Sequence, residues 1–349
     1  KVLVTERDKV LWRNTDPVTD LLHHGVLVVD GKEHDHYRGL MEPALHPSTL
    51  PGYTPLILAH TKKVSSQWKD GEVVDMLVES RKIALLIIMD TLFSKDVWDD
   101  SPYIWKPILK AIEYISPGVW ILWRKMPRFG FRKPLRELDY YLYKIISDRR
   151  RKTADRANNN GQPSAVSRHD LLQHLVNAGL TDQLIRDQMV RMMIAGHDTS
   201  TALLAWVFAL LGQHPEIHQK LVNEVDTLEK LPLLDQVIKE ALRLYPPIHI
   251  GNRHIAEDLE FSEGTVPAGE RLFYSIYLTH HDESIWENAE DFQPERFAQG
   301  RKTPPFSYVP FGGGPRACIG AAFGQAEARI VIAFLLKHYT FEFTQHSIH

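Results

Sequence analysis

Residues 311–320 read Phe-Gly-Gly-Gly-Pro-Arg-Ala-Cys-Ile-Gly, and they hold the only cysteine of the 349-residue chain. Three glycines let the backbone take positive φ or approach a flat, bulky group closely, and Pro315 stiffens the exit from the turn. The apolar stretch that follows, residues 321–339, predicts a helix whose first amide groups favour a thiolate at Cys318. Taken alone, however, the stretch also fits an inert cysteine packed beside a glycine turn.

Composition sets broad limits on function. Hydrophobic residues make up 44% of the chain and charged residues 24%, as in a globular protein large enough to enclose a sizeable ligand. A formal net charge of -3 argues against a nucleic-acid partner, whose binding surface is normally basic. One cysteine excludes an internal disulfide.

No stretch reaches about 18 uninterrupted apolar residues, so we expect no membrane span and a bacterial-type cytoplasmic location. An anchor in a segment before Lys1 stays compatible with the sequence.

Apolar spacing predicts a mainly α chain with a minor β region. The helical stretches are residues 72–93, 134–156, 181–212, 232–245 and 321–339. The β-prone runs are residues 253–261 and 271–278, with a turn-rich segment between them. The third helix is long enough to cross a whole domain, and Thr181 is its expected N-cap.

Poor helix formers gather at the centre of that long helix. Gly196, Asp198 and Thr199 each cost about 0.5 to 1 kcal/mol relative to alanine. The Thr199 hydroxyl can bond back to the carbonyl of Ala195 and open a groove beside Gly196. An acid beside an alcohol can also relay protons. The alternative is a kink or a notch for helix packing.

Two other patterns have both a functional and an ordinary interpretation. Glu240 and Arg243 are three residues apart on a predicted helix, so they share a face and can pair. Such pairs usually lie at the surface, but apolar neighbours indicate a buried helix, and Arg296 is then a candidate partner. Residues 214–218 place two histidines four apart, yet Pro215 stands where a zinc protease needs glutamate. That pattern favours a solvated helix face.

Four motifs follow one another in the chain. They are Ala-Gly-His-Asp-Thr-Ser at 195–200, Lys-Glu-Ala-Leu-Arg at 239–243, Gln-Pro-Glu-Arg-Phe at 293–297 and the cysteine stretch at 311–320. In this order they resemble the oxygen-binding helix, the E-x-x-R helix, the P-E-R-F coil and the haem loop of the cytochrome P-450 family of haem-thiolate monooxygenases. The resemblance spans nearly the whole chain and implies that family's fold, a helical bundle around a buried haem.

The resemblance assigns expected roles to single residues. Cys318 would be the iron ligand. The expected cofactor-binding set is Cys318, Phe311, Gly312, Arg316, Gly320, Arg253, His34 and Arg38. Its cations would pair with the haem propionates, although many relatives carry Trp at the position of His34.

The remaining roles concern proton delivery and structure. Asp198 and Thr199 would deliver protons to dioxygen, and Ala195 and Gly196 would leave room for it. Glu240, Arg243 and Arg296 would form the buried triad that keeps the cysteine loop in shape.

We interpret residues 1–349 as a single haem-binding catalytic domain. Little chain precedes His34, and the family's C-terminal hairpin does not follow His349. N-terminal, C-terminal and some loop segments of the full protein are therefore expected to be missing.

The expected function is a monooxygenase with haem b that hydroxylates or epoxidises a lipophilic substrate. The chain has no nicotinamide or flavin motif, so NAD(P)H would act only through separate partners, a ferredoxin with its reductase or a flavodoxin-type donor. We expect a monomer. A peroxide-driven peroxygenase and a non-catalytic haem sensor or carrier are the alternatives, and the pair Asp198 and Thr199 speaks against both.

The substrate is expected to be a long apolar molecule of the fatty-acid, retinoid or terpenoid type, because Arg316 and the run Lys-Glu-Ala-Leu-Arg-Leu-Tyr-Pro-Pro resemble the branches that hydroxylate such compounds. The expected pocket residues are Met192, Met193, Ile248, His249 and Ile250. Ordinary core packing is the alternative for them.

Overall fold

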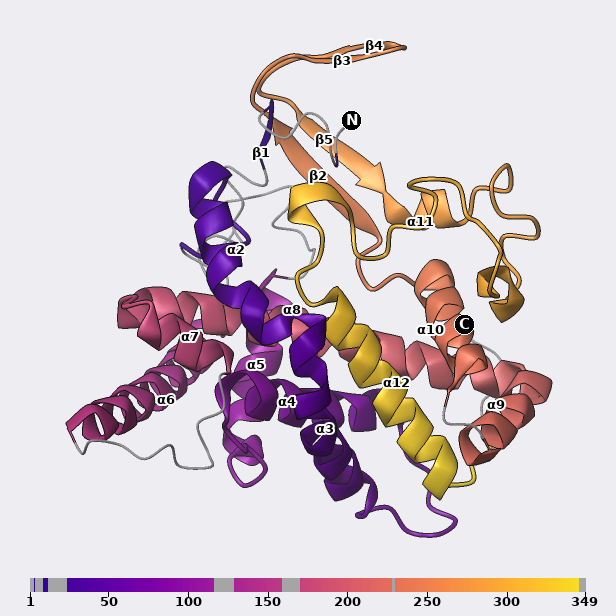
Figure 1. The fold of residues 1–349 in the computed structure, drawn as a ribbon, viewed down its shortest axis with the longest axis horizontal. Helices are drawn as coiled ribbons and strands as arrows, with labels where there is room; N and C mark the ends of the chain where they lie inside the picture. Colours follow the sequence, from indigo (N-terminus) through magenta and orange to yellow (C-terminus); the bar gives the residue numbers. More distant parts are fainter. Residues whose placement is uncertain are drawn as a thin grey trace. The chain divides into compact units, whose positions relative to one another are not determined.

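The fold is mostly helical, with its few strands concentrated after residue 249 (Figure 1). In this computed structural model, residues 3, 9–11, 24–115, 129–158, 170–227 and 230–344 are described. The longer helices are α2 (Gly31–Leu45), α3 (Leu50–Ser65), α4 (Met76–Phe93), α5 (Ser101–Ile115), α6 (Arg132–Asn158), α8 (Asp182–Gln213), α9 (Pro215–Thr227), α10 (Pro232–Leu244) and α12 (Ala321–His338). The short helices are η2 (Pro47–Thr49), α7 (Leu171–Asn177), α11 (Ile276–His280), η4 (Pro294–Phe297) and η5 (Gly314–Arg316). The strands are β1 (Val10–Leu11), β2 (Ile250–Ile255), β3 (Leu259–Phe261), β4 (Gly264–Val266) and β5 (Arg271–Ser275).

The long helices agree closely with the predicted ones. Helix α8 begins one residue after Thr181, whose hydroxyl accepts a hydrogen bond from the backbone N–H of Leu184 at 3.3 Å. Thr181 therefore caps the helix as expected. Helices α6 and α10 also begin and end within two residues of the predicted limits.

The β region departs from the prediction in both runs. The run 253–261 divides between β2 and β3, residues 256–258 lie in neither strand, and β4 lies in the segment expected to be a turn. The run 271–278 was expected to be a strand throughout, but β5 ends at Ser275 and α11 begins at the next residue. The Ser275 hydroxyl accepts from the N–H of Leu278 at 3.0 Å, so a side-chain cap starts a helix inside an apolar run. Strand β5 pairs antiparallel with β2, and β3 pairs with β4 in a separate hairpin.

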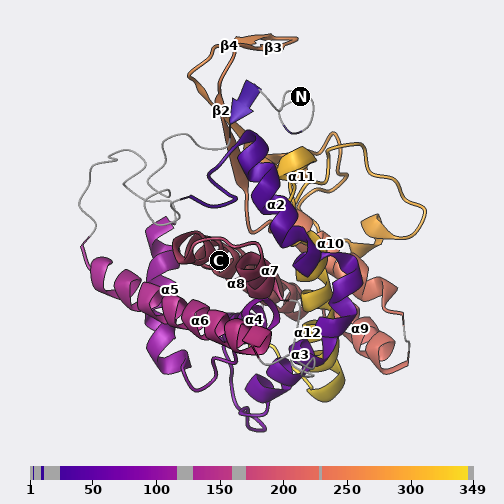
Figure 2. The same ribbon diagram turned by 60° about the vertical axis from the view of Figure 1, so that its left-hand side comes forward.

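The described chain divides into two compact units. The first comprises residues 1–10, 50–84 and 197–349. In this unit α12 packs against α3, α9 and α10, and both views show α12 beside α3 (Figures 1 and 2). Its core includes Leu335, Val331 and Leu211, all almost fully buried. A stacked ring pair, Trp206 on Tyr245, has its centroids 3.7 Å apart.

The second unit comprises residues 11–49 and 85–196. Here α5 packs along α6, and α2 packs against α7 (Figure 2). Two of the boundaries between the units fall within α4 and α8, so the chain passes there from one unit to the other inside continuous helices. The other two fall within β1 and between η2 and α3.

Helix α8 is the single helix among the described residues that is long and apolar enough to cross a membrane by length and composition. We expected no such segment from the sequence. In the structure 56% of its most apolar stretch is buried inside the protein, as in the core helix of a globular fold.

Candidate functional site

The cysteine loop is held by a ladder of backbone hydrogen bonds. The N–H of Cys318 donates to the carbonyl of Phe311 at 2.8 Å, and the N–H of Gly312 donates to the carbonyl of Val309 at 3.0 Å. Gly312 and Gly314 have φ values of 68° and 66°, a region that favours glycine. The loop thus needs two of its glycines for backbone conformation.

The thiol of Cys318 is exposed at the head of α12. Positions beside it are open: a Cβ added at Gly320 would come no nearer than 4.0 Å to the sulfur, and one at Gly312 no nearer than 4.0 Å to its closest neighbour. The N-terminal end of a helix favours negative charge, so this location promotes the thiolate form. An accessible thiolate on an open glycine surface suits metal ligation better than core packing.

The structure brings Glu240, Arg243 and Arg296 together. Arg243 donates to both oxygens of Glu240 at 2.8 Å, and Arg296 donates to the same carboxylate at 3.3 Å. Glu240 and Arg243 are both fully buried. Arg243 also donates to the carbonyls of His280 and Ala289 at 2.8 and 2.7 Å.

This arrangement connects α10 to the long coil that follows α11. Removing one partner from a buried ion pair typically costs about 3 to 5 kcal/mol, because the other charge is left without compensation. The triad therefore clamps the coil that leads to the cysteine loop.

His280 extends the clamp toward the loop, and the sequence did not single it out. Its Nδ1 lies 3.1 Å from the carbonyl oxygen of Arg243, and its Nε2 accepts from the N–H of Val309 at 2.9 Å. The ring is fully buried, and burial lowers its pKa to about 4. In the sequence, His280 follows a short, mainly apolar stretch. That pattern alone does not identify a hydrogen-bond partner.

Asp198 and Thr199 lie at the centre of α8, which continues unbroken through them. Asp198 is exposed and Thr199 is half-buried. Although Asp198 retains contact with solvent, nearby protein atoms desolvate the carboxylate and raise its pKa, and the charge of Arg81 opposes that increase. A carboxyl group with a raised pKa exchanges protons nearer to neutral pH than a free aspartate does.

His197 and Arg81 connect this part of α8 to α4 within the first unit. The Nε2 of the buried His197 lies 3.1 Å from the carbonyl oxygen of Arg81. Burial lowers the pKa of His197 to about 4, so the ring is neutral at physiological pH. The contact keeps the backbone of Arg81 next to the residue that precedes Asp198.

A buried carboxyl group lies beside the same centre, and the sequence analysis missed it. Glu327 on α12 is 1% exposed and accepts from the Ser200 hydroxyl at 2.6 Å. Burial raises its pKa to about 8, and the Ser200 bond opposes that increase. The available signal was an acid on the apolar face of the last helix, four residues after Phe323 and four before Val331.

The space beside Gly196 is filled by the protein. A Cβ at Gly196 would lie 2.4 Å from Cδ1 of Ile88, which is 3% exposed. The packing notch that the sequence left open as an alternative is therefore present, and Ile88 occupies it. The neighbouring Ala195 is exposed, unlike the residues just before it.

The expected pocket residues fall into two groups. Met193 is fully buried and Met192 is 7% exposed, so both lie in packed surroundings. Ile248 and Ile250 are 54% and 48% exposed, which is high for large apolar side chains, and His249 is exposed as well.

The expected propionate cations lie in both units. In the first unit, Arg253 is 3% exposed on β2, donates to the carbonyl of Asn252 at 2.8 Å and lies over the Tyr274 ring. Arg316 is half-buried in η5. In the second unit, His34 is 3% exposed and contacts Asp35 at 3.0 Å, and Arg38 follows one helical turn later on α2.

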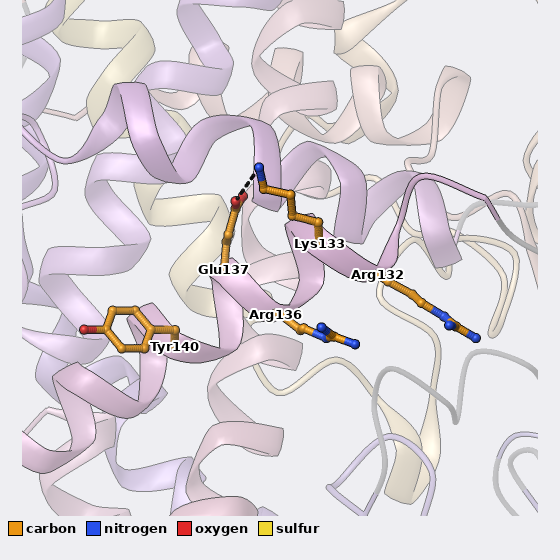
Figure 3. A pocket seen from close by; sticks show the side chains of 5 residues that line it. All are labelled: Arg132, Lys133, Arg136, Glu137 and Tyr140. Carbon is orange, nitrogen blue, oxygen red and sulfur yellow. Dashed lines mark ion pairs between the residues drawn. The ribbon is translucent and has the colours of Figure 1, made fainter.

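Two other features, a pair of histidines and a surface pocket, lie outside this candidate site. The histidines of residues 214–218 pack on aromatic rings, His214 on Phe292 and His218 on Phe343. A surface pocket of about 470 Å³ lies along the start of α6, where Lys133 pairs with Glu137 at 3.8 Å (Figure 3). None of the residues predicted from the sequence lines it. Its lining residues are Arg132, Lys133, Arg136, Glu137 and Tyr140.

Comparison with known proteins gives a consistent result. A family model described as Cytochrome P450 matches residues 1–348. Cyclooctat-9-en-7-ol 5-monooxygenase of Streptomyces melanosporofaciens is 29% identical, over 93% of this chain and 74% of its own length. Pentalenene oxygenase of Streptomyces avermitilis is 28% identical, over 93% of this chain and 75% of its own. The solved structure of a retinoic acid bound cyanobacterial CYP120A1 aligns with a TM-score of 0.83 at 26% identity, over 96% of this chain and 78% of the other.

Proposed function

Because the chain belongs to the cytochrome P450 family, whose members are haem oxidoreductases, we propose that it is a monooxygenase acting on an apolar substrate with electrons from separate proteins. The observation that carries the proposal is the exposed Cys318 at the head of α12, on a loop clamped by a buried ion pair. The family resemblance inferred from four short motifs is confirmed over the whole chain, as is the mainly α fold.

The residues present fit a haem. Cys318 offers an accessible sulfur, and the neighbouring glycines have open space where a side chain would obstruct a flat ring. When bound, haem supplies the iron at which dioxygen takes up two electrons and two protons, so that one oxygen atom enters a substrate bond and the other leaves as water. Cys318 would hold the iron, and Arg253 and Arg316, with His34 and Arg38, would pair with the propionates.

The protein's own task is to position groups and move protons. Asp198 and Thr199 would pass protons toward the reacting oxygen, with Asp198 exchanging them with solvent. Ala195 would line the reaction space, and Gly196 would hold α8 against α4. Residues 1–349 would act as one haem-binding catalytic domain, with the triad of Glu240, Arg243 and Arg296 fixing the loop.

An apolar substrate of the terpenoid, retinoid or fatty-acid type is supported by two observations. Ile248 and Ile250 expose large apolar surfaces that a lipophilic ligand would cover. Proteins similar to this chain in sequence or fold include ones whose names give cyclooctat-9-en-7-ol, pentalenene and retinoic acid as their compounds. Met192 and Met193 would form the inner wall of the substrate pocket, on the side of the protein core.

We place the electron donor outside the chain, as a ferredoxin with its reductase or a flavodoxin-type protein, and NAD(P)H would enter through that donor. The protein would act as a monomer in the cytoplasm. Lys239, Arg301 and Lys302, all in the first unit, would contribute to a docking surface for an acidic donor.

The carbon monoxide difference spectrum of the reduced, haem-loaded protein tests the central claim. Thiolate ligation by Cys318 gives a strongly red-shifted Soret band, and Cys318→Ser should abolish that band while the fold is kept. Folded wild-type protein that binds haem without the band would disprove the proposal. Turnover with a ferredoxin system, compared with hydrogen peroxide, then separates a monooxygenase from a peroxygenase or a haem carrier.

A type I spectral screen tests the substrate class. Fatty acids, retinoids and terpenoids should shift the Soret band of the ferric protein, because an apolar ligand displaces water from the pocket. Binding of small polar aromatics alone would contradict the assignment.

A further inference from the structure

His280 joins the buried ion pair to the chain that enters the cysteine loop. It lies in α11, which packs against α10, and its ring bridges two backbone groups from different segments. One is the carbonyl of Arg243, at 3.1 Å from Nδ1, and the other is the N–H of Val309, at 2.9 Å from Nε2. These partners are 66 residues apart in the chain, so the ring connects two segments that are distant in the sequence.

The two partners dictate the form of the ring. A carbonyl oxygen only accepts, so Nδ1 must carry the proton, and an N–H only donates, so Nε2 must keep its lone pair. We infer this tautomer from the partners. Only the neutral imidazole satisfies both bonds, and a proton on Nε2 would face the N–H of Val309 with a second donor.

The groups around His280 oppose its protonation. Burial lowers the pKa to about 4, the bond to the Arg243 carbonyl acts in the opposite direction, and the Arg243 charge adds to the decrease. The charge of His281, the C-cap residue after α11, also lowers the pKa of His280, and the ring of Tyr308 stacks on it with the ring centroids 5.5 Å apart. The carboxylate of Glu240 already pairs with Arg243 and Arg296.

Loss of the hydrogen bond to Val309 would affect the Cys318 thiolate through two further backbone hydrogen bonds. The carbonyl of Val309 accepts from Gly312, and the carbonyl of Phe311 accepts from Cys318. The residue that His280 holds is therefore the first of this backbone ladder.

We propose that His280 is a positioning residue whose neutral ring holds the cysteine loop in the shape that ligates iron, and whose protonation releases that loop. The proposal rests on the proposed function, since it takes Cys318 as the iron ligand. It makes thiolate ligation sensitive to acid at a residue that does not touch the haem.

The direction of the pH effect follows from the lowered pKa. Unfolded His280 binds a proton near its ordinary pKa of 6.5, whereas the folded form resists protonation until about pH 4. Stability contributed by the neutral ring is therefore complete above about pH 6.5 and is lost as the pH falls toward 4.

The test is an acid titration of the full-length, haem-loaded protein, followed by the red-shifted band of its reduced carbon monoxide complex. His280→Gln keeps an oxygen that can accept from Val309 but does not titrate, so its midpoint should move to lower pH by about half a unit or more. His281→Gln is the matched control, because it removes a neighbouring histidine that does not contact Val309 and whose charge lowers the pKa of His280, so its midpoint should not move to lower pH.

A second measurement needs no haem. Hydrogen exchange of the Val309 amide should be about tenfold faster in His280→Phe than in wild type, and close to wild type in His280→Gln. If His280→Phe does not fold, the acid midpoint of His280→Gln decides the matter.

Two results would overturn the proposal: a His280→Gln midpoint equal to that of wild type, or Val309 exchange unchanged in folded His280→Phe. A wild-type protein without the red-shifted band would instead refute the proposed function. In that case the exchange measurement still decides whether His280 holds the loop.

Discussion

The surroundings of several residues in this protein set their protonation states, and these states determine what each residue can do. Burial keeps His197 and His280 neutral and gives Glu327 a pKa of about 8, and desolvation also raises the pKa of the accessible Asp198. At pH 7 these buried groups are mainly neutral, whereas the accessible Asp198 can exchange protons with solvent. That division suits a site in which one acid delivers protons and the others hold structure.

The first prediction concerns proton delivery by Thr199. Thr199→Ala removes the hydroxyl beside Asp198, so electrons should continue to be consumed while the rate of product formation falls by about 100-fold or more, as for loss of a positioned acid or base. Product formed per NAD(P)H consumed is the measurement. Thr199→Ser keeps the hydroxyl and serves as the control. Coupled turnover in Thr199→Ala at the wild-type rate would contradict the relay.

The second prediction concerns Glu327. Its folded pKa of about 8 lies above the ordinary value of 4.5, so the unfolded chain releases this proton first and stability falls as pH rises from about 4.5 to 8. Glu327→Gln cannot ionise, and we expect it to unfold at a higher temperature than wild type at pH 9. At pH 5 the two should unfold at similar temperatures. Equal pH dependence in wild type and variant would show that Glu327 is ionised in the fold.

Whole elements position these residues through close helix contacts. Helix α8 approaches α4 so closely at Gly196 that Ile88 occupies the space of a side chain. Helix α12 is linked to α8 by the buried Ser200 and Glu327 pair, and α10 is linked to the coil by the triad. The cysteine loop and the centre of α8 are thus each attached to the core of the first unit by buried polar contacts.

The third prediction tests the contact between α8 and α4. Gly196→Ala places a methyl group 2.4 Å from Cδ1 of Ile88, and the overpacking costs about 1 to 3 kcal/mol. The higher helix propensity of alanine offsets about 1 kcal/mol, so the unfolding free energy should fall by up to about 2 kcal/mol. Gly39→Ala is the matched control, since nothing lies within 4 Å of that helical glycine and the change should be neutral or stabilising.

Relief of the same contact gives the complementary result. Ile88→Val removes Cδ1, so adding it to Gly196→Ala should recover part of the lost stability, as denaturant titration would show. Full stability of Gly196→Ala alone would mean that α8 and α4 are not in close contact there.

At the scale of the molecule, charge bears on the electron donor. The chain carries a formal net charge of -3, so attraction to an acidic donor must come from a local group of cations. Lys239, Arg301 and Lys302 belong to the same unit as the cysteine loop. Arg301 and Lys302 are exposed and available for such contacts.

The fourth prediction follows from that docking surface. The rate of reduction by a ferredoxin should fall by about tenfold as salt rises from low ionic strength to several times the physiological level, because exposed charges are screened. Changing both Arg301 and Lys302 to Glu should slow reduction at low salt, whereas Lys133→Glu on α6 should not. A rate independent of salt and of these residues would place the donor elsewhere.

The sequence by itself determined the family, the cysteine proposed to ligate iron, the long helices and the order of the four motifs. These depend on local patterns: apolar periodicity, a side-chain cap at Thr181, glycines that permit positive φ, and short motifs read within ten residues. The tertiary structure alone decided the rest. Ser200 meets Glu327 across 127 residues, Ile88 fills the space at Gly196, and His280 bridges Arg243 and Val309. Such contacts form only when distant helices pack, because burial and the choice of partner depend on the packed core and not on neighbours along the chain.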